Sequence, residues 1–196
     1  MLNQLIKKPI LSCSIIFVIC SVARLIEYFY IRTDETFLSE NFLHKIFGIL
    51  LLWGVLSICK LRWKDIGFSS DGTVSGIGKG LLFGLVCSVF AYAVECIVLL
   101  FLHGNVHLSF YASGFSLTNE KVSQAGILLI LSSVVFNLIN VWMEEGVFRG
   151  LFTKILEGIS YRKSLFFIAF LFGIWHLAMP LRDNLQGELS LLNLIA

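Results

Sequence analysis

The chain has 196 residues, of which 57% are hydrophobic and only 14% are charged, and its mean hydropathy is +0.86. This composition excludes an ordinary soluble domain and predicts an integral membrane protein. The formal net charge of +2 gives no reason to expect a nucleic-acid partner, because the basic residues gather at the ends of apolar runs.

Apolar runs long enough to cross a bilayer recur along the chain and predict an all-α, polytopic helical bundle. The expected helices cover residues 9–23, 42–59, 80–102, 126 to beyond 143, and 165–179. The first two would form an N-terminal transmembrane hairpin within residues 1–62, and the others belong to residues 63–196. No repeat separates these parts, so we expect a single membrane domain of about five full transmembrane helices.

Basic residues predict the orientation of the chain. They cluster at the N-terminus and in the second and fourth connections, whereas the first connection is acidic. Because basic loops remain on the cytoplasmic side, the N-terminus is predicted to be cytoplasmic. The first run leads into Arg24 and Glu27 instead of a cleavage site, so we expect it to be retained as a helix. The lipid bilayer is thus the first expected partner.

A cluster of ionisable residues stands at the end of the fourth apolar run. It comprises Glu144, Glu145 and Arg149, and a lone histidine, His176, follows in the fifth run. A charged side chain near the middle of a membrane helix costs about 3 kcal/mol on insertion scales. These groups therefore need partners or a polar cavity, which makes them candidates for a functional site.

The spacing of these residues predicts that they meet. The fourth helix can continue past Met143 to a turn around Ser160, and Glu144 and His176 lie equally far from that turn. In an antiparallel helical hairpin, residues equidistant from the turn lie at equal depth. We therefore expect Glu144 and His176 to face each other directly or across one water molecule.

Helical spacing also assigns partners within each helix. Asn137, Asn140 and Glu144 fall on one stripe of the fourth helix, and Glu145 has Arg149 at i+4, the favourable order for an ion pair. Glu145 would then be held by Arg149, leaving Glu144 as a general base.

Aromatic residues complete the expected pocket. Phe172 and His176 are i and i+4 on the fifth helix, so the phenyl ring can form a wall beside the imidazole. Phe148 is expected to join Phe172, Asn137 and Asn140 around the substrate.

Two other interpretations remain open. Taken singly, Glu145 and Arg149 could form an ordinary interfacial ion pair, and His176 could be a satisfied histidine near a helix end. A transporter that relays protons through Glu95 and Glu144 is a further alternative, but no repeat or pair of broken helices supports it.

The motifs Glu144-Glu145-x-x-x-Arg149 and Phe172-x-x-x-His176, with Gly150 after the first, resemble those of the CPBP family of intramembrane proteases. That family includes CAAX prenyl endopeptidases and bacterial immunity and abortive-infection proteins. The resemblance extends from about residue 63 onward. It implies that residues 63–196 form a CPBP-like protease domain in a bacterial plasma membrane.

The resemblance also implies a chemistry. Glu144 and His176 would activate a water molecule that attacks a peptide bond of a peptide or protein substrate, with Glu145 and Arg149 holding the arrangement. The family is often called metalloprotease, which makes a divalent ion such as zinc a candidate cofactor with Glu144 and His176 as its ligands. One histidine with two carboxylates is a poor zinc set, however, so we expect no firmly bound metal.

The family has a third motif, His-x-x-x-Asn or His-x-x-x-Asp, on a later helix, and no histidine follows His176 here. We expect a C-terminally truncated domain whose sixth span is cut off near its start. Each lost oxyanion donor typically lowers the rate about 10²- to 10³-fold, so the activity would be impaired. The alternative is a non-catalytic membrane protein of the same fold that acts in bacteriocin immunity or as a scaffold.

Overall fold

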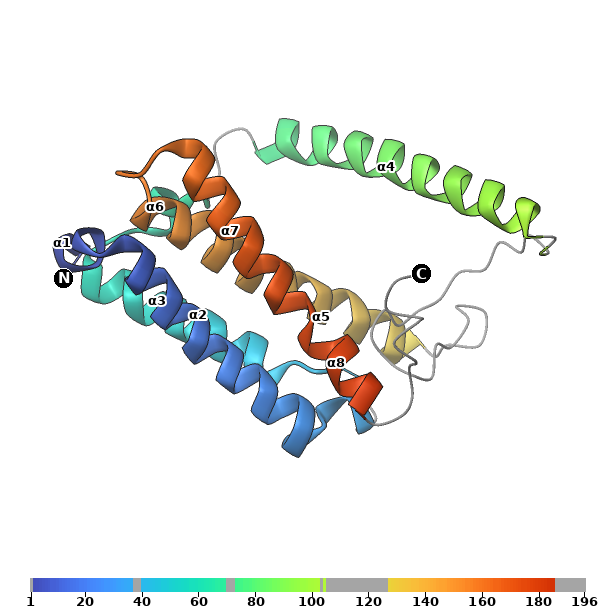
Figure 1. Cartoon of the computed structure of the whole chain (residues 1–196), viewed down its shortest axis with the longest axis horizontal. Coiled ribbons are helices and arrows are strands. Elements are labelled where there is room, and N and C mark those ends of the chain that lie inside the picture. The colour runs from blue at the N-terminus through green and yellow to red at the C-terminus, as the bar shows by residue number, and fades with distance from the viewer. Residues whose placement is uncertain (1, 37–39, 70–72, 103, 105–126, 186–196) are drawn as a thin grey trace. The chain divides into compact units, whose positions relative to one another are not determined.

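The computed structural model describes residues 2–36, 40–69, 73–102, 104 and 127–185, which form helices and their connections (Figure 1). No strand occurs within these ranges, and the all-α prediction is confirmed. Each predicted run forms a helix. These five helices are α2 (Pro9–Ile26), α3 (Leu43–Cys59), α4 (Thr73–Phe101), α5 (Ile127–Glu144) and α7 (Tyr161–His176).

Shorter helical segments complete the described chain. They are α1 (Leu2–Lys7), α6 (Thr153–Ile155), α8 (Ala178–Leu185), two π-helical segments (Glu27–Ile31 and Glu145–Phe152) and two 3₁₀ turns (Thr33–Glu35 and Trp63–Ile66). The fifth run was expected to end at residue 179, but α7 ends at His176, and α8 begins two residues later. The expected sixth span falls within residues 186–196, outside the described residues.

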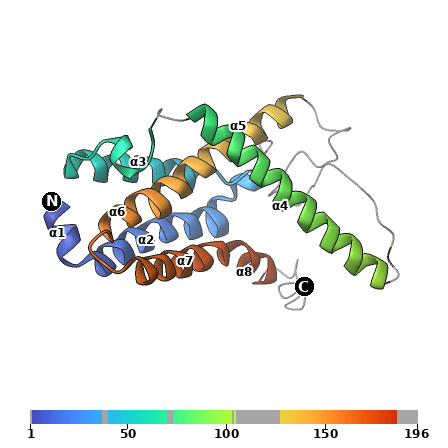
Figure 2. The same ribbon diagram turned by 90° about the horizontal axis from the view of Figure 1, so that it is seen from above.

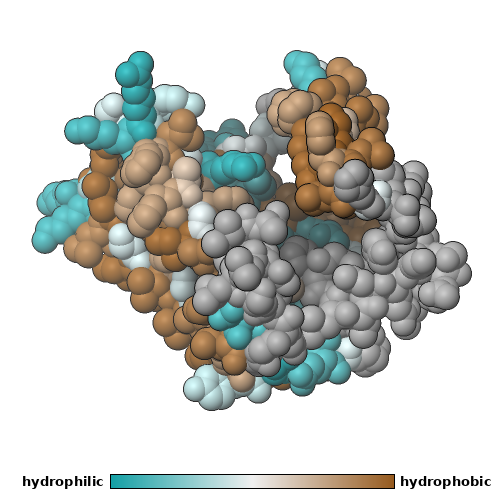
Figure 3. Space-filling model, turned by 45° about the vertical axis from the view of Figure 1, so that its right-hand side comes forward, coloured by the Kyte–Doolittle hydropathy of each residue, from teal (hydrophilic) through white to brown (hydrophobic). Residues whose placement is uncertain are grey.

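Three described helical segments are long and apolar enough to cross a membrane: Pro9–Ile31, Thr73–Phe101 and Tyr161–Leu185. Helix α3 is apolar but shorter. Large apolar side chains lie on the outside of these segments, and Figure 3 shows hydrophobic residues over much of the visible surface. An apolar outer surface suits contact with lipid chains, so the protein is an integral membrane protein.

The chain divides into two compact units. The smaller, Ser69–Tyr111, contains α4, none of whose described residues is buried. The larger, Met1–Phe68 with Ala112–Ala196, unites the N-terminal helices with the hairpin that carries the predicted motifs. Figures 1 and 2 show α2, α3, α5 and α7 of this larger unit as its main helices. The proposed boundary between residues 62 and 63 stays a prediction.

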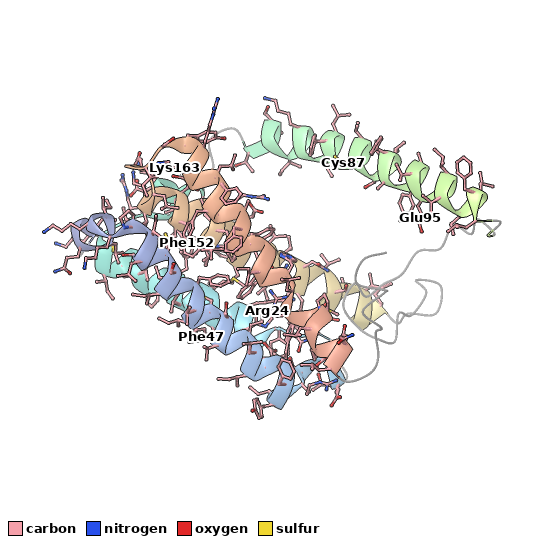
Figure 4. All side chains as sticks on the ribbon, viewed as in Figure 1. Arg24, Phe47, Cys87, Glu95, Phe152 and Lys163 are labelled. Carbon is pink, nitrogen blue, oxygen red and sulfur yellow. The ribbon has the colours of Figure 1, made fainter. Side chains whose placement is uncertain are left out.

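Side chains from α2, α3, α7 and the continuous segment of α5, the second π-helical segment and α6 build the core of the larger unit. Its fully or nearly fully buried residues include Cys13, Phe17, Leu52, Leu56, Met143, Val147, Phe148, Leu151, Phe152 and Trp175. Phe152 points inward between the helices, whereas Phe47 of α3 points outward (Figure 4). The core thus surrounds the segment that carries the motif residues.

Two glycines let that segment approach its neighbours closely. A β-carbon on Gly146 would lie 2.5 Å from Cδ2 of Leu52, and one on Gly150 would lie 2.8 Å from the backbone oxygen of Ile66. A leucine side chain can turn aside, but a backbone carbonyl cannot move without shifting its segment. The lack of a side chain at Gly150 therefore allows the motif helix to pack directly against the 3₁₀ turn Trp63–Ile66.

Glu27 links the end of α2 to the start of α3. Its fully buried carboxylate accepts hydrogen bonds from the backbone N–H groups of Leu43 and His44, at 2.9 and 2.6 Å, and from the hydroxyl of Thr33. Nδ1 of His44 lies 2.5 Å from the same carboxylate. These bonds satisfy N–H groups that the first turn of a helix cannot satisfy internally, so Glu27 caps α3 from another helix.

We expect Gly150→Ala to lower the free energy of unfolding by about 1–3 kcal/mol, the usual cost of forcing extra atoms into a packed core. Gly54→Ala is the matched control, since nothing lies within 4 Å of a β-carbon there and alanine favours the helix. Thermal unfolding of both variants in detergent checks the prediction. An equal melting temperature for the two variants would contradict it.

Candidate active site

The helix that carries the first motif changes its winding at the glutamate pair. Helix α5 ends at Glu144, and a π-helical segment runs from Glu145 to Phe152 before α6 begins. The predicted continuation past Met143 is confirmed, although its π-helical winding was not anticipated. π-helical turns inside α-helices are rare and frequently lie at functional sites, because they change the direction in which side chains point.

The predicted ion pair between Glu145 and Arg149 is confirmed. Nη1 of Arg149 donates to Oε1 of Glu145 at 2.6 Å, and the two side chains are 68% and 39% exposed. The Arg149 guanidinium also lies 5.9 Å from the ring centre of Phe172 on α7. The ion pair therefore faces the helix that carries the second motif.

Phe172 and His176 share one face of α7, as the spacing predicts. Their ring centres are 4.5 Å apart in an edge-to-face arrangement. Nδ1 of His176 lies 2.9 Å from the backbone oxygen of Phe172. A carbonyl oxygen only accepts hydrogen bonds, so Nδ1 is the donor in this contact, and Nε2 is the ring nitrogen left for another partner. The exposed imidazole can thus accept a proton or a hydrogen bond from water.

Trp175 is a site residue that sequence reasoning missed. Its indole N–H donates to Oε1 of Glu144 at 2.9 Å, and the side chain is only 2% exposed. Phe17, Phe148 and His44 surround the indole, with ring centres 6.5, 5.8 and 5.8 Å away. A buried indole usually finds an acceptor for its N–H, and the tryptophan directly before the motif histidine was the available signal.

The bond between Trp175 and Glu144 joins the two motifs across the hairpin. Glu144 lies level with Trp175, whose neighbour in sequence is His176. Among the described residues, nothing bonds to the second carboxylate oxygen, Oε2, which leaves it available to a water molecule. Direct or water-bridged contact between Glu144 and His176 stays a prediction.

The remaining predicted residues take different positions. Asn137 is exposed and donates to the backbone oxygen of Ser133 at 2.8 Å, whereas Asn140 is half-buried. Phe148 is 1% exposed and packs edge-to-face against Phe172, with ring centres 5.1 Å apart. It supports the Phe172 ring from the core. Contact of these residues with a substrate stays a prediction.

A cavity of about 450 Å³ borders the arginine end of the first motif. Its lining includes Arg149, Gly150, Lys154 and Asp65, but neither Glu144 nor His176. The backbone N–H of Arg62 donates to Asp65 and holds the pKa of that partly exposed carboxyl below its ordinary value. Basic and acidic side chains therefore both line this cavity, which lies near the turn that leads into α7.

The motif residues do not make a good metal site. Within the described ranges, no group of three or more histidine, cysteine, aspartate or glutamate side chains is placed to hold a metal ion. Glu145 is paired with Arg149, and Glu144 and His176 each have one atom engaged in a hydrogen bond. A catalytic zinc usually has three protein ligands, so this donor set does not fit a tightly bound zinc ion.

With this geometry established, comparison with known proteins assigns the motif-bearing segment. Residues 126–195 match the family model described as type II CAAX prenyl endopeptidase, Rce1-like. About a third of the chain, at its C-terminal side, is thus similar to this family. This match confirms the resemblance to CPBP intramembrane proteases over the segment that carries both motifs. No curated protein and no solved structure matches the chain.

Because the Glu145–Arg149 pair is exposed, we expect Glu145→Gln and Arg149→Gln to lower the stability by less than about 1 kcal/mol. Lys154→Gln is the control, since it breaks the similarly exposed ion pair with Glu157. Thermal unfolding in detergent should give three nearly equal melting temperatures. A markedly lower value for the first two variants alone would mean that the pair supports the fold.

Proposed function

We propose that the protein is an intramembrane endopeptidase of the CAAX-protease type that cleaves a peptide or protein substrate with a water molecule activated by Glu144. The observation that carries the proposal is the helical hairpin that joins the two motifs. In it the indole N–H of Trp175 donates a hydrogen bond to Glu144, and the guanidinium of Arg149 lies beside the ring of Phe172. The Rce1-like match covers both arms of this hairpin. The basic N-terminus and connections favour a cytoplasmic N-terminus, and the family resemblance alone suggests a bacterial plasma membrane.

In the proposed reaction, Oε2 of Glu144 takes a proton from a water molecule whose oxygen attacks the scissile carbonyl carbon. Nε2 of His176 accepts a hydrogen bond from the other O–H of that water and orients it, without taking the proton. The tetrahedral intermediate then collapses as Glu144 passes its proton to the amide nitrogen, and the C–N bond breaks. The products are a carboxyl group and an amine, so atoms and charge balance.

The neighbouring groups act by positioning. Trp175 fixes one oxygen of Glu144 and thereby the direction of the other. Arg149 holds Glu145, and Phe172 stands between Arg149 and the imidazole of His176. Fixing a base and its partner before the substrate arrives lowers the entropic cost of reaching the transition state.

A non-catalytic role on the same fold is the second candidate. Glu145, Glu144 and His176 each have a structural partner, which is what a scaffold or an immunity protein would need. In that case the polar motif groups would serve helix packing, and binding to a partner would carry the biological effect.

Glu144→Gln should reduce cleavage of a membrane-anchored reporter peptide about 10²- to 10⁴-fold, because the amide cannot accept the proton of water. Glu157→Gln, which changes a surface glutamate, should retain full activity. Both variants are reconstituted in liposomes and assayed by product formation over time. Equal turnover in the two variants would refute the proposed base, and absence of cleavage in the unaltered chain would favour the non-catalytic role.

Trp175→Phe keeps an aromatic ring in the core but removes the N–H donated to Glu144. We expect kcat to fall about tenfold or more with a smaller change in KM, since a hydrogen bond to a charged group contributes about 1.5–3 kcal/mol. Trp53→Phe, at a 59% exposed position, is the control. A loss of melting temperature without a loss of kcat would assign Trp175 to packing alone.

A further inference from the structure

Arg24 is a buried cation that forms no ion pair with any described carboxylate. Its side chain extends from α2 into the space between the helices, and the residue is 6% exposed (Figure 4). Nη2 donates to the hydroxyl of Tyr28 at 2.9 Å, and the guanidinium carbon lies 4.3 Å from the centre of a Trp175 ring. Nε and Nη1 are buried, and no described group accepts a hydrogen bond from them.

The other buried charged side chains in the described part of this unit have polar or oppositely charged partners. The pairs are Glu27 with His44, Lys45 with Glu40, and Arg182 with Asp34 and Asp183. An unpaired charge in a low-dielectric interior is costly, and an ionisable residue inside a membrane segment is a functional candidate by default. Arg24 is therefore the position in the described part of this unit where binding of an anion would be most strongly favoured.

A cavity of about 320 Å³ lies beside Arg24, between α2 and the α7–α8 segment. Its polar lining comes from Arg24 and Ser21, and Oγ of Ser21 is also buried without a described partner. The indole N–H of Trp175 is already engaged with Glu144. The other lining residues are apolar: Phe17, Leu25, Ile174, Leu177, Ala178 and Leu181. The cavity is thus apolar with one cationic, hydrogen-bonding corner.

This lining defines the chemistry of an occupant. A guanidinium with two free nitrogens beside a hydroxyl suits a carboxylate or a phosphate, and apolar walls suit a hydrocarbon chain. Leu25, Leu177 and Leu181 are also 39%, 54% and 50% exposed, on segments apolar enough to cross a membrane. A peptide would bring many backbone polar groups, for which the described lining offers only Arg24 and Ser21.

We propose that Arg24, Ser21 and this cavity form a binding site for an anionic amphiphile of the bilayer. Its carboxylate or phosphate head accepts hydrogen bonds from Arg24 and Ser21, and its hydrocarbon chain fills the apolar part of the cavity. The head neutralises the guanidinium charge. Trp175 joins this site to the proposed active site, since its ring covers Arg24 and its N–H holds Glu144.

Dibromostearate is the probe, because bromine quenches tryptophan fluorescence on contact and Trp175 lines the cavity. The full chain in a neutral detergent is titrated with dibromostearate, its uncharged methyl ester and brominated phosphatidylglycerol. Trp175→Phe gives the background from the other three of the four tryptophans. We expect saturable quenching by the acid, the phospholipid or both, and about tenfold or more weaker binding of the ester, since a charged hydrogen bond contributes at least that factor.

Arg24→Gln should weaken binding of the charged probe about tenfold or more and leave binding of the ester unchanged. Arg62→Gln is the control, since the Arg62 side chain is 69% exposed and does not line the cavity. Ala178→Leu narrows the cavity with Arg24 intact and should also weaken binding. This second variant keeps the test decisive if circular dichroism shows that Arg24→Gln does not fold.

Several results would overturn the proposal. Equal affinity for the acid and the ester would show that the charge of the head group does not contribute to binding. Unchanged binding in Ala178→Leu would show that the amphiphile does not bind in this cavity. Displacement of the amphiphile by inorganic phosphate at similar concentration would indicate a site for free anions. Displacement by a peptide with a free C-terminal carboxylate, at a lower concentration than stearate, would assign the site to peptides.

Discussion

A polar group buried among apolar helices is stable only if another group satisfies its hydrogen-bonding capacity, and several of these requirements converge on Trp175. The indole N–H satisfies one oxygen of Glu144, and a ring face lies against the guanidinium of Arg24. The rest of the ring packs on Phe17 and Phe148. One side chain of α7 therefore fixes the positions of groups from α2 and α5 at the same time.

The same requirement fixes the neighbouring ends of the helices. Glu27 caps the first turn of α3, and Arg182 ties α8 to Asp34 in the connection after α2. Helices in lipid gain little from hydrophobic association, because lipid chains are as apolar as leucine side chains. Buried polar contacts between helices can then decide which packing arrangement forms, and in this protein they cluster around α2 and its neighbours.

Sequence patterns correctly predicted the features that depend on the spacing of residues within one helix. The apolar runs located the helices, and i,i+4 spacing correctly paired Glu145 with Arg149 and Phe172 with His176. Partners brought together by folding could not be predicted in this way. Trp175 and Glu144 are separated by 31 positions, and the place of the tryptophan beside the motif histidine marks it as a candidate without naming its partner. The π-helical segment also escaped prediction, because α- and π-helical winding require the same types of residue.

The π-helical segment Glu145–Phe152 makes the site sensitive to chain length as well as to residue type. A π-helical turn accommodates one more residue than the equivalent α-helical turn. Deleting a single residue there would restore regular α-helix, which keeps the residues beyond Phe152 near their present directions but changes the directions of the side chains inside the segment. Arg149 and Gly150 lie inside the segment, so the approach of Arg149 to Phe172 and the packing of Gly150 against Ile66 would both be lost. A one-residue deletion in this segment should therefore be tolerated less well than most substitutions, and the length of the motif is as much a part of the site as its glutamates.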